Sequence, residues 1–496
     1  MEANEQPPAA QPTLIDQYQL TVNSIVVDIR IEQAPEQPVP SYTISIANIS
    51  DTTKLILEKI RQEFISKLDT RALEQAESGE GVGEALRRHF EDEIRTLLRR
   101  YFPQIEKDSE DMLVNYLLEE NLGLGKIEIL LKDANLEEIV INGHTDPVWV
   151  YHRKHAWLKT NVQILTEARI RHYAMTIGRE VGKEITNLSP LMDAHLLTGD
   201  RVNATLYPIS SRGNTITIRK FAEDPWTITK FIKAGTISLS AAALIWIAIQ
   251  NEMSILIAGG TGSGKTSMLN VVSNFFPPNQ RIISIEDTRE LQLPNTLHWV
   301  PMETRLPNPE GKGEVSMLDL LVNSLRMRPD RIVVGEIRRQ KEAQVLLEAI
   351  HTGHSVYGTI HANDASEVIT RLTNPPINIP KPMISSLALV VVQNRNRRTG
   401  KRRTLQVAEI LSTGDAKVLL QLDVYNDRLV KIGESESLLE KLRLYTGMSN
   451  EQISKELEEK MKILKWLILH NIDNVDDIGA FFSRYYLGLI KPDELN

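Results

Sequence analysis

The chain has 496 residues, of which 42% are apolar and 25% charged, and its 57 basic and 65 acidic side chains give a formal charge of −8. At ~150 residues per domain this length corresponds to about three domains, and the composition is that of a globular protein with a sizeable core, which excludes disorder as the main state. The absence of cysteine excludes disulfides, thiolate zinc sites, iron–sulfur clusters and cysteine nucleophiles, and the negative charge excludes a global positive field for holding nucleic acid.

The sequence also lacks the signals of export and membrane insertion. Its longest apolar run extends from Ala241 to Ile249, which is shorter than the ~18 residues that a membrane-spanning helix needs. The first residues, Met1 to Glu5, form no basic or apolar signal region. We therefore expect a cytoplasmic protein with no transmembrane segment of its own.

The amino-terminal part is predicted to be a flexible tail followed by an α+β region. Residues 1–12 hold three prolines among alanines and glutamines and have little to bury. Residues 13–110 alternate between strand-like and helical patterns. The expected elements are strands at Val22–Ile31 and Tyr42–Ile46 and helices at Thr52–Leu68 and Gly83–Tyr101.

Residues 111–225 are predicted to form a second α+β domain. The segment begins with a helix that ends at Gly123 and continues with short strands bounded by turn residues. The expected strands are Leu136–Val140, Val148–Tyr151, Arg201–Leu206 and Thr215–Arg219. The segment Ala222–Thr227, which contains Asp, Pro and Trp, indicates a linker to the next domain.

The second half of the chain is predicted to be an α/β core followed by a helical region. Strand and helix patterns alternate through residues 226–412, as a parallel sheet with covering helices requires. Beyond Thr413, residues 413–496 are mostly helical in pattern, and Ile453–Leu469 is amphipathic and charged.

A phosphate-binding loop is the strongest motif of the core. The apolar strand Met253–Ala258 runs directly into a glycine-rich loop that opens a helix, and the loop reads GxxxxGK[ST]: Gly259, Gly260, Thr261, Gly262, Ser263, Gly264, Lys265 and Thr266. The glycines let the loop turn so tightly that backbone N–H groups and the helix amino end point at phosphates. Lys265 of such a loop reaches the β and γ phosphates of ATP, and Thr266 offers its hydroxyl to Mg²⁺. ATP and Mg²⁺ are therefore the expected cofactors.

Two other apolar runs of the core end in carboxylates. One leads to Glu286-Asp287 and the other to Gly335-Glu336, and both would emerge at the carboxyl edge of an open parallel sheet, where ligands bind. Gly335 stands where the second strand usually carries a metal-holding Asp, so we expect Glu286 and Glu336 to share the catalytic work. The alternative is that one of these carboxylates only caps a helix. The expected metal ligands are Thr266, Glu336 and Asp287.

Two histidines and a basic run follow the carboxylates. His354 and His361 flank the strand Ser355–Gly358, where they could sense the γ-phosphate or stabilise charge. Six basic residues lie between Arg395 and Arg403. We interpret this run as the solvated tip of a hairpin between two apolar strands.

Together these segments resemble the type II secretion and type IV pilus ATPase superfamily in order and spacing. The resemblance is carried by the Walker A loop GGTGSGKT, the aspartate box ISIEDTRELQLP, the Walker B segment LRMRPDRIVVGEIR and the histidine box TGHSVYGTIHAND. It extends to PLMDAHLLTGDRVNAT and TITIRKF and covers Leu136 to Leu411. The segments YNDRLVKIGES and GMSNEQISKELEEKMKILKWL are similar to the archaeal branch, which builds archaeal pili and the archaellum.

The resemblance implies a RecA-like core that assembles as a ring of six, with residues 111–225 as a sensor domain that moves against it during ATP turnover. It implies that Arg201 and Arg219 reach the phosphates from the sensor domain, where guanidinium groups would neutralise γ-phosphate charge. The alternative for both arginines is a salt-bridged strand position. The implied partners are a polytopic membrane platform protein and, indirectly, filament subunits, which places the protein at the inner face of the membrane.

Two other function classes stay open beside this motor ATPase. A nucleic-acid translocase would need a local basic pore, and no nucleic acid is expected on the net charge. A non-hydrolysing, nucleotide-dependent scaffold would not need the residues that activate water, which this chain retains. The four-cysteine zinc module that many bacterial members of the family carry after the core is absent, because the chain has no cysteine.

Overall fold

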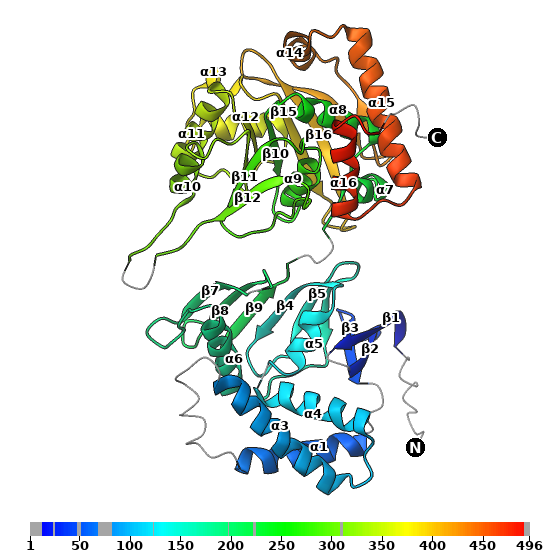
Figure 1. Cartoon of the computed structure of the whole chain (residues 1–496), viewed down its shortest axis with the longest axis vertical. Coiled ribbons are helices and arrows are strands. Elements are labelled where there is room, and N and C mark those ends of the chain that lie inside the picture. Colours follow the sequence, from blue (N-terminus) through cyan, green and yellow to red (C-terminus); the bar gives the residue numbers. More distant parts are fainter. Residues whose placement is uncertain are drawn as a thin grey trace, which may run out of the picture. The chain divides into compact units, whose positions relative to one another are not determined.

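The computed structural model divides the chain into two compact units, Met1–Glu223 and Asp224–Asn496 (Figure 1). It describes residues 12–22, 25–46, 51–67, 82–122, 124–196, 198–221, 225–307 and 311–490. The predicted flexible tail lies outside these residues except for Pro12. Each unit is built on its own nine-stranded sheet.

The sheet of the first unit has the order β1-β2-β3-β6-β5-β4-β9-β8-β7. All its neighbours are antiparallel except β3 and β6. Its strands are β1 (Thr13–Val22), β2 (Ile25–Gln33), β3 (Ser41–Ile46), β4 (Leu136–Asn142), β5 (Trp149–His152), β6 (Ala156–Thr160), β7 (Leu191–His195), β8 (Arg201–Thr205) and β9 (Thr215–Arg219). Its helices are α1 (Asp51–Lys67), α3 (Val82–Tyr101), α4 (Lys107–Leu122), α5 (Lys126–Lys132) and α6 (Glu167–Glu180).

The amino-terminal strands are part of this sheet and do not form a separate one. In β2 every second residue from Ile25 to Ile31 is buried, and these side chains join the same apolar core as β4, β8 and β9. The Tyr18 and Tyr42 hydroxyls each donate a hydrogen bond of 2.6 Å to the buried carboxylate of Asp133, which follows α5. The polar sequence of β1 gave no strand signal, because this strand shows only one residue fully buried.

Helices α1, α3 and α4 pack on one another around a small core of their own. The core consists of Leu57, Ile60, Phe64, Phe90, Ile94, Leu97, Leu98, Leu113, Val114, Leu117 and Leu118. This helical layer accounts for the 3.6-residue apolar spacing seen in the sequence before residue 123.

The sheet of the second unit has the order β12-β11-β13-β14-β10-β15-β16-β17-β18. The strands from β12 to β15 are parallel and those from β15 to β18 antiparallel. The strands are β10 (Ile255–Gly259), β11 (Arg281–Glu286), β12 (His298–Glu303), β13 (Arg331–Val334), β14 (Ser355–Ile360), β15 (Leu389–Arg395), β16 (Arg402–Ile410), β17 (Ala416–Asp423) and β18 (Arg428–Lys431). The helices are α7 (Ile228–Lys233), α8 (Leu239–Gln250), α9 (Lys265–Ser273), α10 (Met317–Ser324), α11 (Gln340–His351), α12 (Ala365–Thr373), α13 (Lys381–Ile384), α14 (Ser437–Thr446), α15 (Asn450–Leu469) and α16 (Val475–Tyr486).

Both faces of this sheet are covered by helices, which explains why its strands are continuous apolar runs. In β10, Ile255 and Ile257 pack with α8, α9, α15 and α16, whereas Leu256 and Ala258 pack with α10, α11 and α12. The predicted fold class is confirmed: an α/β P-loop core with parallel strands around the loop is preceded by an α+β part and followed by helices. Two strands, β17 and β18, extend the core sheet before those helices begin.

The carboxy-terminal helices are fixed to the core by an aromatic cluster. Trp246 of α8 stacks on Phe275 with ring centroids 5.3 Å apart and meets Phe482 of α16 edge-on at 4.8 Å. Lys460 of α15 is fully buried, lies over the Trp246 ring and donates hydrogen bonds to Gln250 and Glu456. Of the helices in the described part of the chain, none is long and apolar enough to cross a membrane.

Candidate functional site

The glycine-rich loop follows β10 and adopts a conformation that only glycine permits at its two ends. A Cβ on Gly259 would lie 2.3 Å from the Ser263 hydroxyl and 2.5 Å from the Gln393 carbonyl. Gly264 has φ +93° and is the N-cap of α9, with no side chain that could cap the helix. The first N–H groups of α9 are thereby left without a side-chain cap, which is the arrangement that binds phosphate at a helix amino end.

A chain of polar contacts connects Lys265 to the carboxylates at the ends of β11 and β13. The Lys265 Nζ lies 3.1 Å from the Gly260 carbonyl and 3.4 Å from His361 Nδ1. His361 Nε2 lies 3.0 Å from Glu336 Oε1. Arg338 then bridges the two carboxylates, at 2.8 Å from Glu336 and 2.6 Å from Asp287. The structure therefore brings together four predicted site residues, with Arg338 as the link between them.

Burial determines the protonation of the side chains that form these polar contacts. Burial and the neighbouring Lys265 lower the pKa of His361, so its imidazole is neutral at pH 7. A neutral ring with its proton on Nε2 donates to Glu336 and accepts from Lys265 through Nδ1. Burial also lowers the pKa of Lys265, whereas the charge of Glu336 opposes that shift.

Glu286 occupies a different environment, in the interior beside Gly335. Its side chain is 2% exposed; Oε1 accepts hydrogen bonds from the N–H groups of Glu290 and Leu291, and Oε2 is buried without a hydrogen-bond partner. Burial raises its pKa to about 7. A Cβ on Gly335 would lie 3.3 Å from the Glu286 Cγ. The missing Asp at residue 335 thus has a steric reason, because the Glu286 side chain packs against that position.

The two histidines do not bracket the site. His361 follows β14 at the carboxyl edge of the sheet, whereas His354 precedes β14 and its Nδ1 lies 3.1 Å from the Ala349 carbonyl at the end of α11. A strand of six residues separates them, which is about 20 Å at ~3.3 Å per residue. The expectation that His354 shares the phosphate site with His361 is wrong within the chain, because a residue before a parallel strand lies at the opposite edge from one after it.

Arg201 and Arg219 belong to the first unit. They are direct cross-strand partners in β8 and β9, so their side chains leave the same face of that sheet. Arg201 forms a two-pronged ion pair with Asp193, with N–O distances of 3.0 and 2.6 Å. Arg219 pairs across the sheet with Glu138, whose pKa is raised by burial and lowered by that arginine. Both arginines thus have acidic neighbours within their own sheet.

The donor set fits a metal that arrives with a nucleotide. In the described residues, no group of three or more His, Asp or Glu side chains is arranged to hold a metal ion. Mg²⁺ in nucleotide sites usually takes only one or two protein oxygens and completes its shell with phosphates and water. Asp287 and Glu336, drawn together on Arg338 near the loop that carries Thr266, match that requirement.

The basic hairpin of β15 and β16 has a contact that its sequence did not predict. The hairpin itself is confirmed, with Arg395 opposite Arg402 next to its turn. The Arg402 Nε, however, donates a hydrogen bond of 3.0 Å to the Gly262 carbonyl of the phosphate loop. The tip is therefore not wholly solvated. This contact arises because β15 lies next to β10 in the sheet. Local sequence patterns do not reveal which strands are neighbours.

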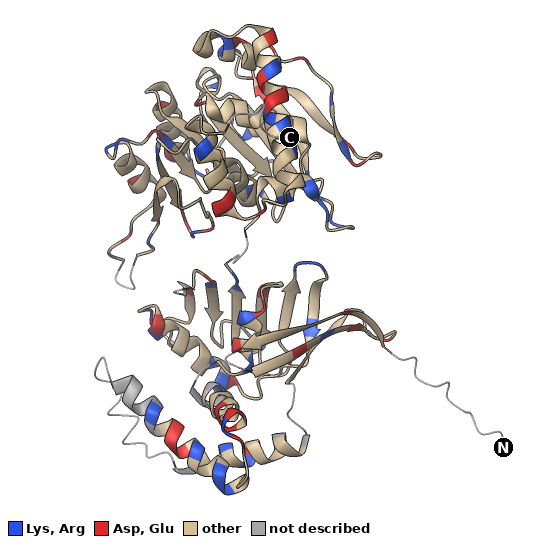
Figure 2. Cartoon of the chain, turned by 45° about the vertical axis from the view of Figure 1, so that its right-hand side comes forward, with Lys and Arg blue, Asp and Glu red and all other residues tan. Residues whose placement is uncertain are grey.

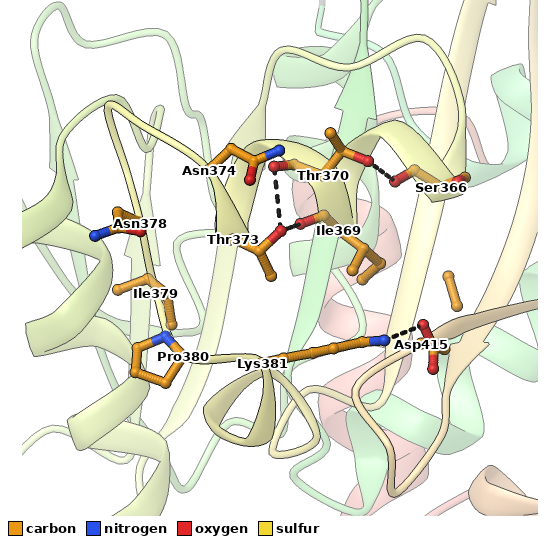
Figure 3. A pocket seen from close by; sticks show the side chains of 11 residues that line it. Ser366, Ile369, Thr370, Thr373, Asn374, Asn378, Ile379, Pro380, Lys381 and Asp415 are labelled. Carbon is orange, nitrogen blue, oxygen red and sulfur yellow. Dashed lines mark hydrogen bonds and ion pairs between the residues drawn. The ribbon is translucent and has the colours of Figure 1, made fainter.

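A separate cavity of about 650 Å³ lies between α12, α13 and the turn from β16 to β17 (Figure 3). Lys381 and Asp415 form an ion pair of 2.6 Å across one side. The hydroxyls of Thr370 and Thr373 are used by carbonyls of their own helix. None of the residues lining this cavity belongs to the phosphate loop or to the carboxylate chain.

Comparison with known proteins gives consistent matches. The family described as "Type II/IV secretion system protein" matches residues 122–417. An uncharacterized protein of Methanocaldococcus jannaschii is 31% identical over 490 residues, which cover 94% of this chain and 86% of that protein. The type IV secretion system protein PtlH of Bordetella pertussis is 30% identical over 56% of this chain and 91% of its own. The X-ray structure of the Legionella pneumophila ATPase DotB aligns with 72% of this chain and 94% of its own, at 19% identity and a TM-score of 0.44.

Proposed function

The chain belongs to the type II/IV secretion system protein family, and on that premise we propose that it is an ATPase that powers a secretion or filament-assembly machine. The observation that carries the proposal is the continuous chain from the phosphate loop through Lys265, His361 and Glu336 to Asp287. Such a chain links the group that holds the γ-phosphate to the carboxylates that act in hydrolysis.

In this proposal the residues divide into a binding set and a hydrolysing set. The loop N–H groups and Lys265 hold the β and γ phosphates. Thr266, Glu336 and Asp287 would hold Mg²⁺, which neutralises phosphate charge when it is bound. Binding of Mg²⁺ would require Arg338 to release Glu336 or Asp287, because Arg338 forms ion pairs with both carboxylates in this structure.

Glu286 is the proposed general base. A pKa of about 7 places it where a base is most effective at neutral pH, and its Oε2 is not occupied by another donor. Water attacks the γ-phosphorus, the bond to the β–γ bridging oxygen breaks, and the water proton passes to Glu286. The neutral imidazole of His361 would report the state of the γ-phosphate from Lys265 to Glu336.

The finer features are also proposals. We propose a ring of six subunits that docks on a polytopic membrane protein and drives assembly of a type IV pilus-like filament, either an archaeal pilus or an archaellum. The resemblance of the carboxy-terminal segments to the archaeal branch motivates the choice of an archaeal filament, and the chain matches a protein of M. jannaschii over nearly its whole length. Arg201 and Arg219 would complete the site on domain closure, in which case Arg201 must exchange Asp193 for the γ-phosphate.

A nucleic-acid translocase is the competing function. In the part of the chain that the structure describes, lysines and arginines are interspersed with acidic residues over the elements of each unit (Figure 2). Turnover that rises with DNA and loses that rise at high salt would favour translocation over filament assembly.

The test of the proposed function uses two variants that fail by different routes. Lys265→Ala should weaken ATP binding by about 10-fold or more, because it deletes a cation that contacts the phosphates. Glu336→Gln should bind ATP and reduce turnover by about 100-fold or more, because it keeps the shape but removes the carboxylate.

The matched controls lie away from the site. Lys381→Ala removes a lysine paired with Asp415, and Glu434→Gln removes an exposed carboxylate paired with Lys431. Both should retain binding and turnover within about 2-fold. Wild-type turnover in Glu336→Gln would refute its catalytic role, and absence of ATP binding by the wild-type protein would refute the proposed function as a whole.

A further inference from the structure

The basic hairpin of β15 and β16 reaches the phosphate loop because of the strand register. β15 runs parallel to β10 with Gln393 opposite Gly259, the last residue of β10. β15 then continues to Arg395, so its last two residues pass alongside the loop that follows Gly259. Arg402 opens β16 directly opposite Arg395. Two arginines from neighbouring strands thus arrive at the same side of the loop.

Both arginine side chains lie against the loop backbone. Besides the bond from Arg402 Nε to the Gly262 carbonyl, a Cβ on Gly262 would lie 3.2 Å from Arg395 Nη1. A Cβ on Gly264 would lie 3.6 Å from the Arg402 Cδ. Glycine at residue 262 therefore leaves room for the Arg395 side chain, and the Arg402 side chain lies at contact distance from Gly264.

The other basic residues of the hairpin have different surroundings. Lys401 and Arg403 both pair with Asp427, at 3.0 and 2.8 Å, which offsets part of the positive charge on that side of the hairpin. Arg397 and Arg398 are exposed at the tip. The alternation of side chains along a strand separates Arg402 from Arg403, so Arg402 faces the loop while its neighbour faces the acidic side.

The neighbours of β10 in the sheet indicate how a nucleotide would be oriented on the phosphate loop. β10 lies between β14 and β15. Lys265, His361 and Glu336 join the loop to the β14 and β13 side, so the γ-phosphate belongs on that flank. A nucleotide whose γ-phosphate points toward β13 directs its α-phosphate and nucleoside toward the opposite flank, where Arg395 and Arg402 stand.

We propose that Arg395 and Arg402 bind the nucleoside end of ATP, from the α-phosphate outward. The inference rests on the proposed function and names the part of the ligand that these residues recognise. A guanidinium group suits both parts of this end, since it pairs with phosphate oxygens and stacks on the face of a base. The two side chains come from strands held in the core sheet, so this subsite belongs to the same unit as the phosphate loop.

The test compares ATP with inorganic pyrophosphate, which offers two phosphates to the loop and has no nucleoside. Arg402→Gln and Arg395→Gln should each weaken ATP and ADP binding by about 10-fold, the scale of one charge-assisted hydrogen bond. Pyrophosphate binding, measured by displacement of a fluorescent ADP analogue from each variant, should change by less than about 2-fold. Arg398→Gln at the exposed tip is the matched control and should bind all three ligands as the wild type does.

Two results would overturn this inference. Equal losses for ATP and pyrophosphate would mean that the arginines only hold the shape of the loop. Unchanged ATP binding in both variants would return them to a solvated hairpin. Melting temperatures without ligand establish that each variant is folded, and Arg402→Lys, which keeps the charge, should recover only part of the affinity because it cannot stack or bind bidentately. Failure of the wild-type protein to bind ATP would instead count against the proposed function.

Discussion

The two edges of the parallel sheet in the second unit differ in the partners of their charged side chains. At the carboxyl edge, Lys265, Glu336 and Asp287 contact one another through His361 and Arg338, and Glu286 keeps one carboxylate oxygen without a partner. At the amino edge, Arg331 is fully buried, donates hydrogen bonds to Gln280, Tyr357 and the Ile249 carbonyl, and lies over the Phe276 ring.

This difference in partners indicates that the carboxyl edge serves function and the amino edge serves stability. The charges of the carboxyl edge contact other side chains that can release them when a ligand binds, and burial shifts their pKa values. The charged side chains of the amino edge form hydrogen bonds with neutral side chains and with the backbone. Asp330, for example, accepts a hydrogen bond of 2.6 Å from the Arg281 N–H. Substitutions at the first edge should therefore reduce turnover in a folded protein, and substitutions at the second should reduce folding.

The largest effect is expected from Glu286→Gln. Loss of a general base should lower ATP turnover by about 10²- to 10⁴-fold while ATP affinity changes by less than about 3-fold. Steady-state hydrolysis and equilibrium ATP binding measure the two quantities. Retained turnover would show that Glu336 acts without Glu286 and that the catalytic work is not divided.

The same residue should make stability depend on pH in an unusual direction. Its folded-state pKa of about 7 is above the ordinary value of 4.5 for a glutamate, so between these pH values the folded protein holds a proton that the unfolded chain has lost. The stabilisation is complete below pH ~4.5 and disappears as the pH rises through ~7, and a shift of this size corresponds to about 3 kcal/mol.

Urea unfolding from pH 5 to 8 should show this loss in the wild type and not in Glu286→Gln. The difference between the two proteins isolates Glu286 from the histidines that titrate in the same range. Parallel pH dependences in both proteins would contradict the assignment of a raised pKa to this carboxyl.

Arg331→Met should lower the free energy of unfolding by about 2 kcal/mol, because the Tyr357 hydroxyl and the Ile249 carbonyl lose their buried partner. Turnover per folded molecule should stay within about 2-fold of the wild type. Arg326→Met, an exposed position before the same strand, is the control and should leave stability unchanged. A large loss of turnover without a change in stability would break the distinction between the edges.

The smallest effects on turnover are expected from substitution of the two histidines, one at each edge of the sheet. His361→Ala should lower turnover by about 10-fold, because it removes the link between Lys265 and Glu336, whereas His354→Ala should lower it by less than about 2-fold. Both variants can be assayed side by side with saturating ATP. Equal losses would mean that His354 acts at the site of a neighbouring subunit.

Features formed by residues that are contiguous along the chain could be predicted from the sequence alone. The phosphate loop is fixed by a strand, a glycine turn and a helix within about a dozen residues, so local chemistry sufficed. The carboxyl-edge position of Glu286 and Glu336 followed from one rule, since every parallel strand in an α/β sheet ends at the same edge. The same rule excludes His354 from that edge, because His354 precedes the strand that His361 follows, although both residues lie in one motif.

Contacts between side chains on different strands could not be predicted from the sequence, because they depend on the order of the strands in the fold. The parallel pairing of β3 with β6 joined the amino-terminal strands to the sheet of residues 136–219, and the Tyr18 and Tyr42 contacts to Asp133 fixed them there. The order β14-β10-β15 placed His361 on one flank of the phosphate loop and Arg402 on the other. Strand order and register depend on contacts between segments far apart in the sequence, and local hydrophobic patterns carry no information about them.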